Sequence, residues 1–232
     1  MTTPDLYAAV RAGEDLLHAA GHGRVEGVKR ALAQGADVNT LRSDQTALMG
    51  STSRRSLDCV QVLIEHGANV DLKNRMGWAP IHEAAAKDFS EIVEVLATGG
   101  ANVDAHDRLG VTPLIAAIRN KSNTAALKLL EVGASAQAPD FDGKSPVMWA
   151  VVMENDTLLS ALVARGAPLA HKDQAGRTAM DFAKESGWDL GLGILEQAAR
   201  IQAKATAQAE DVSAEAVPAV PMVSKIGKRK MG

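Results

Sequence analysis

The sequence predicts an all-α solenoid of about six helix-turn-helix units, and two recurring motifs and the composition support this fold class. A Thr-Pro-Leu-like motif recurs at a constant interval, and its copies begin at Thr46, Ala79, Thr112, Ser145 and Thr178. A Gly-Ala pair recurs at the same interval after a slightly shorter first step, at Gly35, Gly67, Gly100, Gly133 and Gly166. Aromatic residues make up only 3% of the chain, so close packing of helices through alanine and leucine is expected. A fixed period of this length is typical of stacked repeats, each of which buries its apolar face against its neighbours.

Residues 1–13 are expected to form a helix that caps the stack. Thr3 has the hydroxyl of an N-cap, Pro4 suits the first helical turn, and Asp5 favours the positive end of the helix dipole. The helix should run to Arg11 and end before Gly13. A solenoid needs such a cap because its terminal repeat would otherwise expose an apolar face.

The units of the repeat domain, residues 14–198, share one plan for their two helices. The hydroxyl at the start of the motif can accept a hydrogen bond from a backbone N–H of the first turn, and the proline that follows it loses no hydrogen bond there. The second helix carries a leucine that recurs with the repeat: Leu63, Leu96, Leu129, Leu162 and Leu195. We expect this row to form a continuous core through the stack.

Glycines recur in the turn that precedes each first helix, at Gly77, Gly110, Gly143 and Gly176. They allow a left-handed backbone without a steric penalty, so each turn is expected to form a projecting hairpin. Asp44 takes the place of this glycine in the second unit, which makes the second hairpin the least regular of the row.

The chain beyond the last motif is expected to close the stack and then lose its order. Gly191 and Gly193 weaken the helix expected there by roughly 1 kcal/mol each, so this unit is interpreted as the C-terminal cap. Residues 199–232 are expected to form a helix extension and then, from about Ala205, a disordered tail. The tail ends in the basic segment Lys225–Lys230, which suits nuclear import or phosphate contact, although a solvated tail accounts for it as well.

Two segments carry a resemblance to a known family. The opening Ala79-Pro-Ile-His82 and the closing Gly67-Ala-Asn-Val70 resemble the Thr-Pro-Leu-His and Gly-Ala-Asp-Val signatures of the ankyrin repeat, and the resemblance extends over residues 14–198. It implies a right-handed stack of helix-turn-helix units whose hairpins project as a row of fingers. It also implies that His82 hydrogen-bonds its hairpin, and that Asn39 lies in a context like those accepted for asparagine hydroxylation. The implied function is that of a scaffold or adaptor, which holds a protein partner on its concave, finger-bearing face without catalysis.

The sequence contains none of the common catalytic, cofactor-binding or metal-binding motifs. His82-Glu83 begins like a zinc-protease motif but lacks the second histidine, and Gly191-Leu-Gly193 lacks the third glycine of a dinucleotide-binding loop. We therefore expect no enzyme activity, no cofactor and no metal. The single cysteine, Cys59, indicates a reducing compartment, and we find neither a signal peptide nor a membrane-spanning run. A cytoplasmic location is predicted, with the nucleus as the alternative.

The partner-binding surface is predicted at the hairpins and the first helices. These positions carry more cations than acids, so we expect a basic face for an acidic peptide or protein surface, although the net charge of the chain is −3. Neighbouring hairpins also carry apolar residues, of which Trp78 is the best candidate anchor. The predicted binding residues are Arg75, Met76, Trp78, Arg108, Leu109, Val111, Phe141 and Lys144.

Three alternatives to this interpretation stay open, and one of them is an enzyme that acts through a cleft that the sequence cannot show. Trp78 would be a structural staple if it folded back across the adjoining hairpin. The same cations would suit a nucleic-acid-associated or nuclear regulatory protein, but few aromatic residues for base stacking are interleaved with them. We expect a monomer that binds no membrane.

Overall fold

The structure is a computed structural model that describes residues 3–215, and these residues form helices and loops without a named strand. The chain divides after Leu195 into two compact units. The helices are α1 (Thr3–Gly21), α2 (Val25–Ala33), α3 (Ala47–Ser53), α4 (Leu57–Glu65), α5 (Pro80–Ala86), α6 (Ser90–Thr98), α7 (Pro113–Arg119), α8 (Asn123–Glu131), α9 (Pro146–Val152), α10 (Asp156–Ala164), α11 (Ala179–Ser186) and α12 (Asp189–Glu215). The predicted all-α fold class is confirmed.

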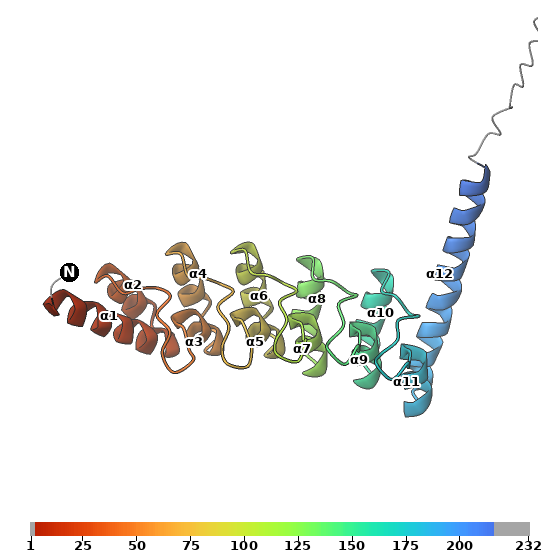
Figure 1. Cartoon of the computed structure of the whole chain (residues 1–232), viewed down its shortest axis with the longest axis horizontal. Coiled ribbons are helices and arrows are strands. Elements are labelled where there is room, and N and C mark those ends of the chain that lie inside the picture. The colour runs from red at the N-terminus through yellow and green to blue at the C-terminus, as the bar shows by residue number, and fades with distance from the viewer. Residues whose placement is uncertain (1–2, 216–232) are drawn as a thin grey trace, which may run out of the picture. The chain divides into compact units, whose positions relative to one another are not determined.

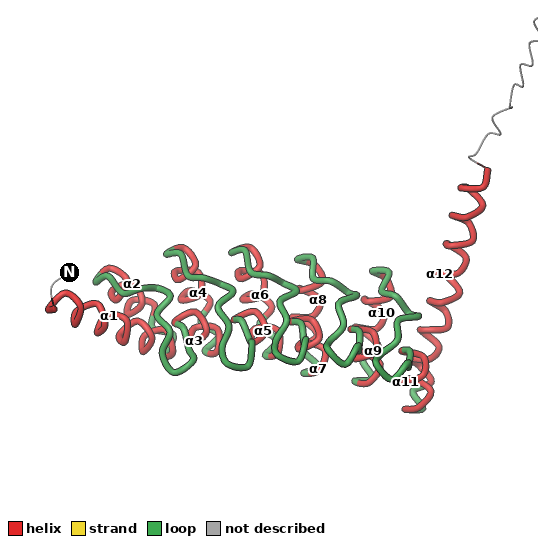
Figure 2. The backbone as a smooth tube through the Cα atoms, viewed as in Figure 1, coloured by secondary structure: helices red, strands yellow, loops and turns green. Residues whose placement is uncertain are grey.

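The helices of the unit before Leu195 stack as antiparallel pairs (Figure 1). The first helices of successive pairs, α3, α5, α7 and α9, form the lower row in Figure 1 and are called the inner helices; α4, α6, α8 and α10 form the upper row and are called the outer helices. The loop after each outer helix descends to a hairpin before the next inner helix starts, as the green tube in Figure 2 shows. The predicted solenoid of helix-turn-helix units with projecting hairpins is therefore confirmed.

The core contains the predicted row of leucines, which lies on the outer helices and on the start of α12. All five are at most 1% exposed: Leu63, Leu96, Leu129, Leu162 and Leu195. Alanines of the inner helices, such as Ala84 and Ala117, are also fully buried. Their small side chains let neighbouring helices approach closely, so one continuous cluster runs through the stack.

The hydroxyl caps fix where most inner helices begin. The side chains of Thr46, Thr112, Ser145 and Thr178 each accept a hydrogen bond from the backbone N–H three residues later, at 3.2, 3.3, 3.4 and 3.3 Å. Ala79 has no hydroxyl. There the N–H of Ala79 itself donates to Nδ1 of His82 at 3.2 Å, so the histidine satisfies a different N–H at the start of the helix.

A polar ladder joins successive units on the loops that follow the outer helices. Side-chain oxygens of one unit accept from the backbone N–H of the next at 2.7, 2.9 and 2.8 Å, in the pairs Asn39–Asn69, Asp71–Asn102 and Asp104–Ser135. These bonds satisfy loop N–H groups that no helix pairs, and they fix the spacing of the units.

The second hairpin has a turn of its own. Ser43 and Asp44 both have positive φ, 48° and 67°, and an isolated bridge joins Arg42 to Gln45. The Asp44 carboxylate also accepts from the backbone N–H of Arg75 in the next hairpin. Asp44 therefore replaces the glycine and adds a link between the two hairpins.

The prediction that the first helix ends before Gly13 is wrong. Helix α1 continues through this glycine to Gly21. Gly13 packs against the hairpin that follows α2, where a Cβ would lie 3.1 Å from Oγ1 of Thr40. An interior glycine costs a helix about 1 kcal/mol, and packing against the next segment offsets that loss. The glycine therefore allows a close contact and does not stop the helix.

The glycines near the C-terminus also do not break their helix. A Cβ on Gly191 would lie 1.9 Å from Cε3 of Trp188, so the indole ring occupies the space that the glycine leaves. Helix α12 runs to Glu215, which corrects the expectation of disorder from about Ala205. The basic segment Lys225–Lys230 lies outside the described residues.

Two turn glycines allow a direct test of the hairpin packing. Gly77 and Gly176 have nearly the same φ, 83° and 78°, but a Cβ on Gly77 would lie 2.8 Å from the backbone N of Arg108, whereas Gly176 has no atom within 4 Å. We expect Gly176→Ala to lower the free energy of unfolding by about 1–2 kcal/mol, the penalty of a left-handed alanine. Gly77→Ala should lose at least about 1 kcal/mol more, because the next hairpin must move. Urea denaturation would measure both, and equal losses would contradict the close packing of the two hairpins.

Candidate functional site

The hairpin tips, called fingers below, are built around one side chain each. The fingers are numbered by their unit: the third is residues 74–78, the fourth 107–111, the fifth 140–144 and the sixth 173–177. In each, one side-chain oxygen accepts from the backbone N–H groups two and four residues later, at 2.8 to 3.1 Å. The acceptors are Asn74, Asp107, Asp140 and Asp173. Because asparagine and aspartate form such turns readily, the four fingers share one backbone shape.

Backbone hydrogen bonds join each finger to the next. The N–H of Arg108 donates to the carbonyl of Met76 at 3.2 Å, and the N–H of Phe141 donates to the carbonyl of Leu109 at 3.0 Å. A third bond, from Gln174 to Asp142, continues the series at 3.0 Å. The fingers therefore present one continuous rim.

Three predicted binding residues are large, apolar and exposed on adjacent fingers. Met76 and Leu109 are each 67% exposed, and Phe141 is 61% exposed. Met76 and Leu109 occupy equivalent positions, but Phe141 takes the position of Arg108 in the preceding finger. The Phe141 ring turns back over that finger and stacks on His106, with ring centroids 6.3 Å apart. The exposed apolar surface thus spans three fingers, although Phe141 belongs to a different row.

Three predicted binding residues are less exposed than expected, and one of them is Lys144, whose side chain is only 23% exposed. Val111 is only 4% exposed, because it packs beside Ile115 at the start of the next inner helix. Trp78 is half-buried: its Nε1–H donates to Oδ2 of Asp107 at 3.1 Å and its ring stacks on His82. The expectation that Val111 lies exposed is wrong. Trp78 folds across the adjoining finger, as the alternative interpretation described.

A shallow pocket of about 370 Å³ lies between the third and fourth fingers and helix α7. Its apolar walls are Met76, Trp78, Leu109, Val111 and Ala116. Its polar rim is formed by Asp107, Arg119 and Asn120. Five of these eight residues come from fingers and the other three from α7 or its C-cap, so the pocket exists only because the two elements pack together.

Trp149 also belongs to this face, although it is not among the binding residues predicted from the sequence. Trp149 lies on α9, and its Nε1–H donates to Oδ2 of Asp140 at 2.8 Å. The Arg119 guanidinium lies 4.7 Å from the centre of its ring, and Lys144 Nζ lies 5.0 Å from it. Trp149 stands one full repeat after Ala116, a pocket residue, so the repeat spacing contained the signal that places it beside the pocket.

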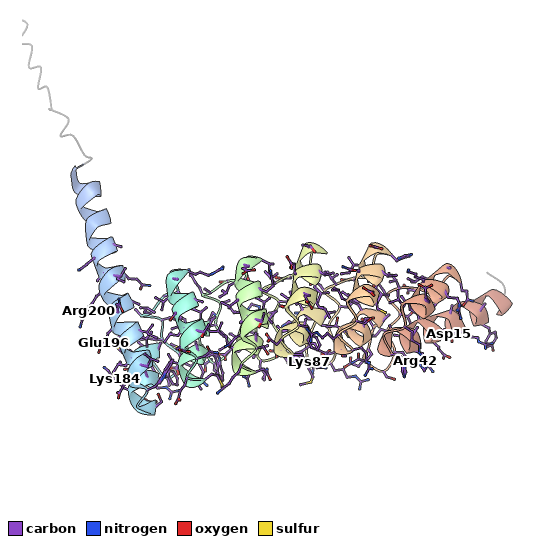
Figure 3. The ribbon with its side chains drawn as sticks, turned by 180° about the vertical axis from the view of Figure 1, so that it is seen from behind. Asp15, Arg42, Lys87, Lys184, Glu196 and Arg200 are labelled. Atoms are coloured by element: carbon purple, nitrogen blue, oxygen red, sulfur yellow. The ribbon has the colours of Figure 1, made fainter. Side chains whose placement is uncertain are left out.

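Local ion pairs reduce the basic excess that the sequence predicts on this face. Arg42 pairs with Glu14, Lys87 with Glu83, Lys144 with Asp142, and Arg177 with Asp173. Arg42 and Lys87 both lie along the lower edge of the stack in Figure 3. Among the side chains of residues 7–205, three arginines of the third finger, the fourth finger and α7 have no carboxylate at ion-pair distance: Arg75, Arg108 and Arg119. Unpaired positive charge therefore surrounds the pocket and its two fingers.

His82 is buried beneath the third finger. Burial lowers the pKa of its imidazole to about 4, and the nearby Asp107 carboxylate offsets only part of this effect. The ring is therefore neutral near pH 7, and its Nδ1 accepts the N–H of Ala79. This hydrogen bond lies within the start of α5, because Ala79 is the N-cap of that helix. The bond from His82 to its hairpin that the resemblance implies therefore stays a prediction.

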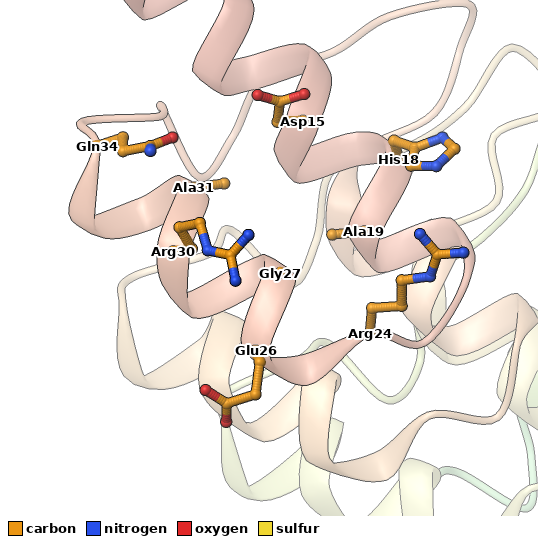
Figure 4. Close-up of a pocket in the computed structure, with 9 residues that line it drawn as sticks. All are labelled: Asp15, His18, Ala19, Arg24, Glu26, Gly27, Arg30, Ala31 and Gln34. Atoms are coloured by element: carbon orange, nitrogen blue, oxygen red, sulfur yellow. The ribbon is translucent and has the colours of Figure 1, made fainter.

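Other hollows of the surface lie at the N-terminal end. One of about 410 Å³ lies between α1 and α2 and is lined by Asp15, His18, Arg24, Glu26 and Arg30, among others (Figure 4). A second, of about 560 Å³, lies between α1 and the second hairpin. Both mix acids and bases of the first unit, and neither includes a predicted binding residue.

Among the side chains that the structure describes, no three metal-ligating groups lie close enough together to hold a metal ion. None of the helices described is long and apolar enough to cross a membrane. Asn39 uses its side-chain oxygen in the polar ladder and its amide in a weak contact with the carbonyl of Gly67 at 3.5 Å.

Comparison with known families matches this chain to the family described as ankyrin repeats (3 copies), over residues 16–107 and 72–140. The chain is also similar to a solved ankyrin repeat domain from Acinetobacter baumannii AYE, with a TM-score of 0.75 and 24% sequence identity. That alignment covers 79% of this chain and 97% of the other. The structure of EF0377, an ankyrin repeat protein, is similar with a TM-score of 0.75 and 26% identity over 80% of this chain and 98% of its own.

Proposed function

Because the chain belongs to the ankyrin repeat family, we propose that it is a noncatalytic scaffold or adaptor that binds a protein or peptide on its fingers and inner helices. Ankyrin repeats are in general protein-interaction modules. Residues 14–198 form the proposed binding domain, and Met76, Leu109 and Phe141 form the proposed centre of the contact.

The observation that carries this proposal is the exposed apolar surface on three adjacent fingers. Isolated exposed apolar residues are normal on proteins, but a contiguous group with a polar rim is typical of interfaces. Met76, Leu109 and Phe141 are all largely exposed, and backbone hydrogen bonds join their fingers. A rim of this kind is rigid before binding, so little ordering entropy opposes association.

The charge of the rim favours an acidic partner. Arg75 and Arg108 stand beside the apolar tips and have no carboxylate at ion-pair distance in the described part of the chain. Unpaired cations around an apolar centre raise the rate of encounter with a negatively charged surface and select against positively charged ones.

Site-specific photo-crosslinking would test the proposed face. A photoreactive phenylalanine analogue at Leu109 should capture a protein partner in cell extract, and mass spectrometry would identify the crosslinked segment. The matched control places the same group at Gln61, an exposed residue of the outer helix α4. We expect crosslinks from position 109 at several times the yield from position 61, and the Arg75→Glu, Arg108→Glu double variant should lower that yield.

Equal yields from the two positions would argue against the finger face. The double charge reversal tests the acidic partner separately, because both side chains are exposed and changing them should leave the circular dichroism spectrum unchanged. If a partner is crosslinked at position 109 and the double charge reversal does not change the crosslinking yield, the finger face is supported but the role of charge is excluded.

A further inference from the structure

We infer that the pocket between the third and fourth fingers binds an apolar side chain of an acidic peptide segment, and that Arg119 binds a carboxylate next to that side chain. The inference rests on the proposed function and names the chemistry of the partner. It follows from three features: how Arg119 is held, what its neighbours already bind, and what the pocket walls offer.

Arg119 is held in position without losing its hydrogen-bonding capacity. It ends α7, and its guanidinium stacks on the Trp149 ring at 4.7 Å from the centroid. Trp149 is itself held by Asp140 at 2.8 Å. No hydrogen bond or ion pair of the described side chains uses the Arg119 guanidinium, so its N–H groups can bind a planar carboxylate, which arginine does with two parallel hydrogen bonds. Arg119 is exposed, so these N–H groups are accessible to a partner.

The carboxylates near Arg119 are already occupied. Oδ1 of Asp107 accepts the backbone N–H groups of Leu109 and Val111 at 2.8 and 2.9 Å, and Oδ2 accepts the Trp78 indole. These three N–H donors occupy both oxygens of the one acid that lines the pocket, although the carboxylate keeps its charge. Asp140 is engaged in the same way by its own finger and by Trp149. Among the residues that the structure describes, Arg119 therefore forms no ion pair with a carboxylate.

The pocket walls select an apolar group next to that carboxylate. Met76 and Leu109 flank the opening and are largely exposed, whereas Val111 and Ala116 form a buried floor. A volume of about 370 Å³ accommodates one large side chain and part of the adjoining peptide backbone. Covering the exposed thioether and isobutyl groups would remove apolar surface from water, which favours association.

Nucleic acid fits the same features less well. A phosphate would also bind Arg119, but a base needs an aromatic face on which to stack. The Trp149 ring is covered by Arg119 and Lys144, and the Trp78 ring is stacked on His82. Trp78, the aromatic residue that lines the pocket, and the neighbouring Trp149 thus both already contact other side chains, which favours a peptide carboxylate over a nucleotide.

Selection from a random dodecapeptide library displayed on phage, with the full chain as bait, would test the inference. We expect enriched peptides to carry an acidic residue within three positions of a large aliphatic or aromatic residue. Fluorescence anisotropy with an enriched peptide should then show a loss of affinity of about tenfold or more in Arg119→Gln. Arg119→Lys should retain part of the affinity, since a lysine keeps the charge but not the two parallel bonds. Arg30→Gln is the control, because it removes an exposed arginine of α2 outside the pocket, and it should leave the peptide affinity unchanged.

The outcomes separate this inference from the proposed function. The inference would be overturned by enriched peptides that lack acidic residues, or by peptides that bind Arg119→Gln as tightly as the unchanged chain. If the Met76→Ser, Leu109→Ser variant still abolishes the binding of those peptides, the proposed finger face is retained. Peptides indifferent to the Met76→Ser, Leu109→Ser variant would contradict the finger face as well. A library that yields no binder would contradict both the inference and the proposed finger face. If double-stranded or single-stranded oligonucleotides bind the chain and this binding depends on Arg119, the ligand is nucleic acid and not a peptide.

Discussion

Leu96→Ala is expected to lower the free energy of unfolding by about 2–5 kcal/mol, the largest effect of a single substitution considered for this protein. Leu96 is fully buried on α6, in the middle of the leucine row that runs through the stack. Removing its side chain loses the transfer free energy of the buried carbons and leaves a cavity between neighbouring units, which the backbone cannot close without moving both. Urea denaturation followed by circular dichroism would measure the change.

Leu109→Ala is the matched control for this substitution, since it removes the same atoms from a side chain that is 67% exposed on a finger. It should change the free energy of unfolding by less than about 0.5 kcal/mol. Similar losses for the two variants would mean that the assignment of core and surface leucines is wrong. The control has a second use, because Leu109→Ala should reduce partner binding while leaving the fold intact.

The second large effect is a dependence of stability on pH that arises from His82. Its pKa is lowered to about 4 by burial, below the value of about 6.5 expected in the unfolded chain. Between these values the unfolded chain binds more protons than the folded one, so stability rises with pH across this window. Lowering the pH from 7 to 4 should therefore remove about 3 kcal/mol through this one residue. Measuring the free energy of unfolding at half-unit steps of pH would trace the loss.

His82→Met separates this contribution from the titration of carboxylates. Methionine occupies the equivalent position at Met49 and Met148, where both side chains are buried, so the repeat accommodates it. The variant also loses the hydrogen bond from Ala79, which lowers its stability at neutral pH. The decisive quantity is the slope between pH 6.5 and 4, which should be smaller in the variant. Parallel pH profiles would show that His82 is not the buried titrating group.

The fold could be predicted from the sequence because its rules are local and repeated. The Thr46 and Thr112 hydroxyls cap helices through bonds to residues three positions away, and Gly77 forms its turn within five residues. The buried leucines could be predicted from their constant spacing in the sequence, because each leucine occupies the same position of its repeat. Because these patterns recur five times, the fold can be predicted even though some copies are irregular, such as the one in which Ala79 replaces the capping hydroxyl.

The candidate site was only partly predictable because it depends on contacts between units. Met76 and Leu109 were identified correctly as exposed, since they stand at the tips of turns. Val111 looked like a tip residue as well, but it belongs to a buried cluster against which Ala86 and Trp149 of the neighbouring units pack. The orientation of Trp78 depends on Asp107, which lies in the next finger. No pattern within one repeat specifies these contacts with neighbouring units.

The sequence by itself determined the period, the helix pairs, the turn glycines and the core leucines of this protein, because capping, backbone conformation and repeated apolar positions act over a few residues. Only the tertiary structure decided that Gly13 and Gly191 lie inside helices, and that Trp149 and Arg119 stack at the rim of a pocket. These outcomes depend on which side chain from a neighbouring segment fills a given space. Such pairings can join residues a whole repeat apart, where packing overrides local propensity.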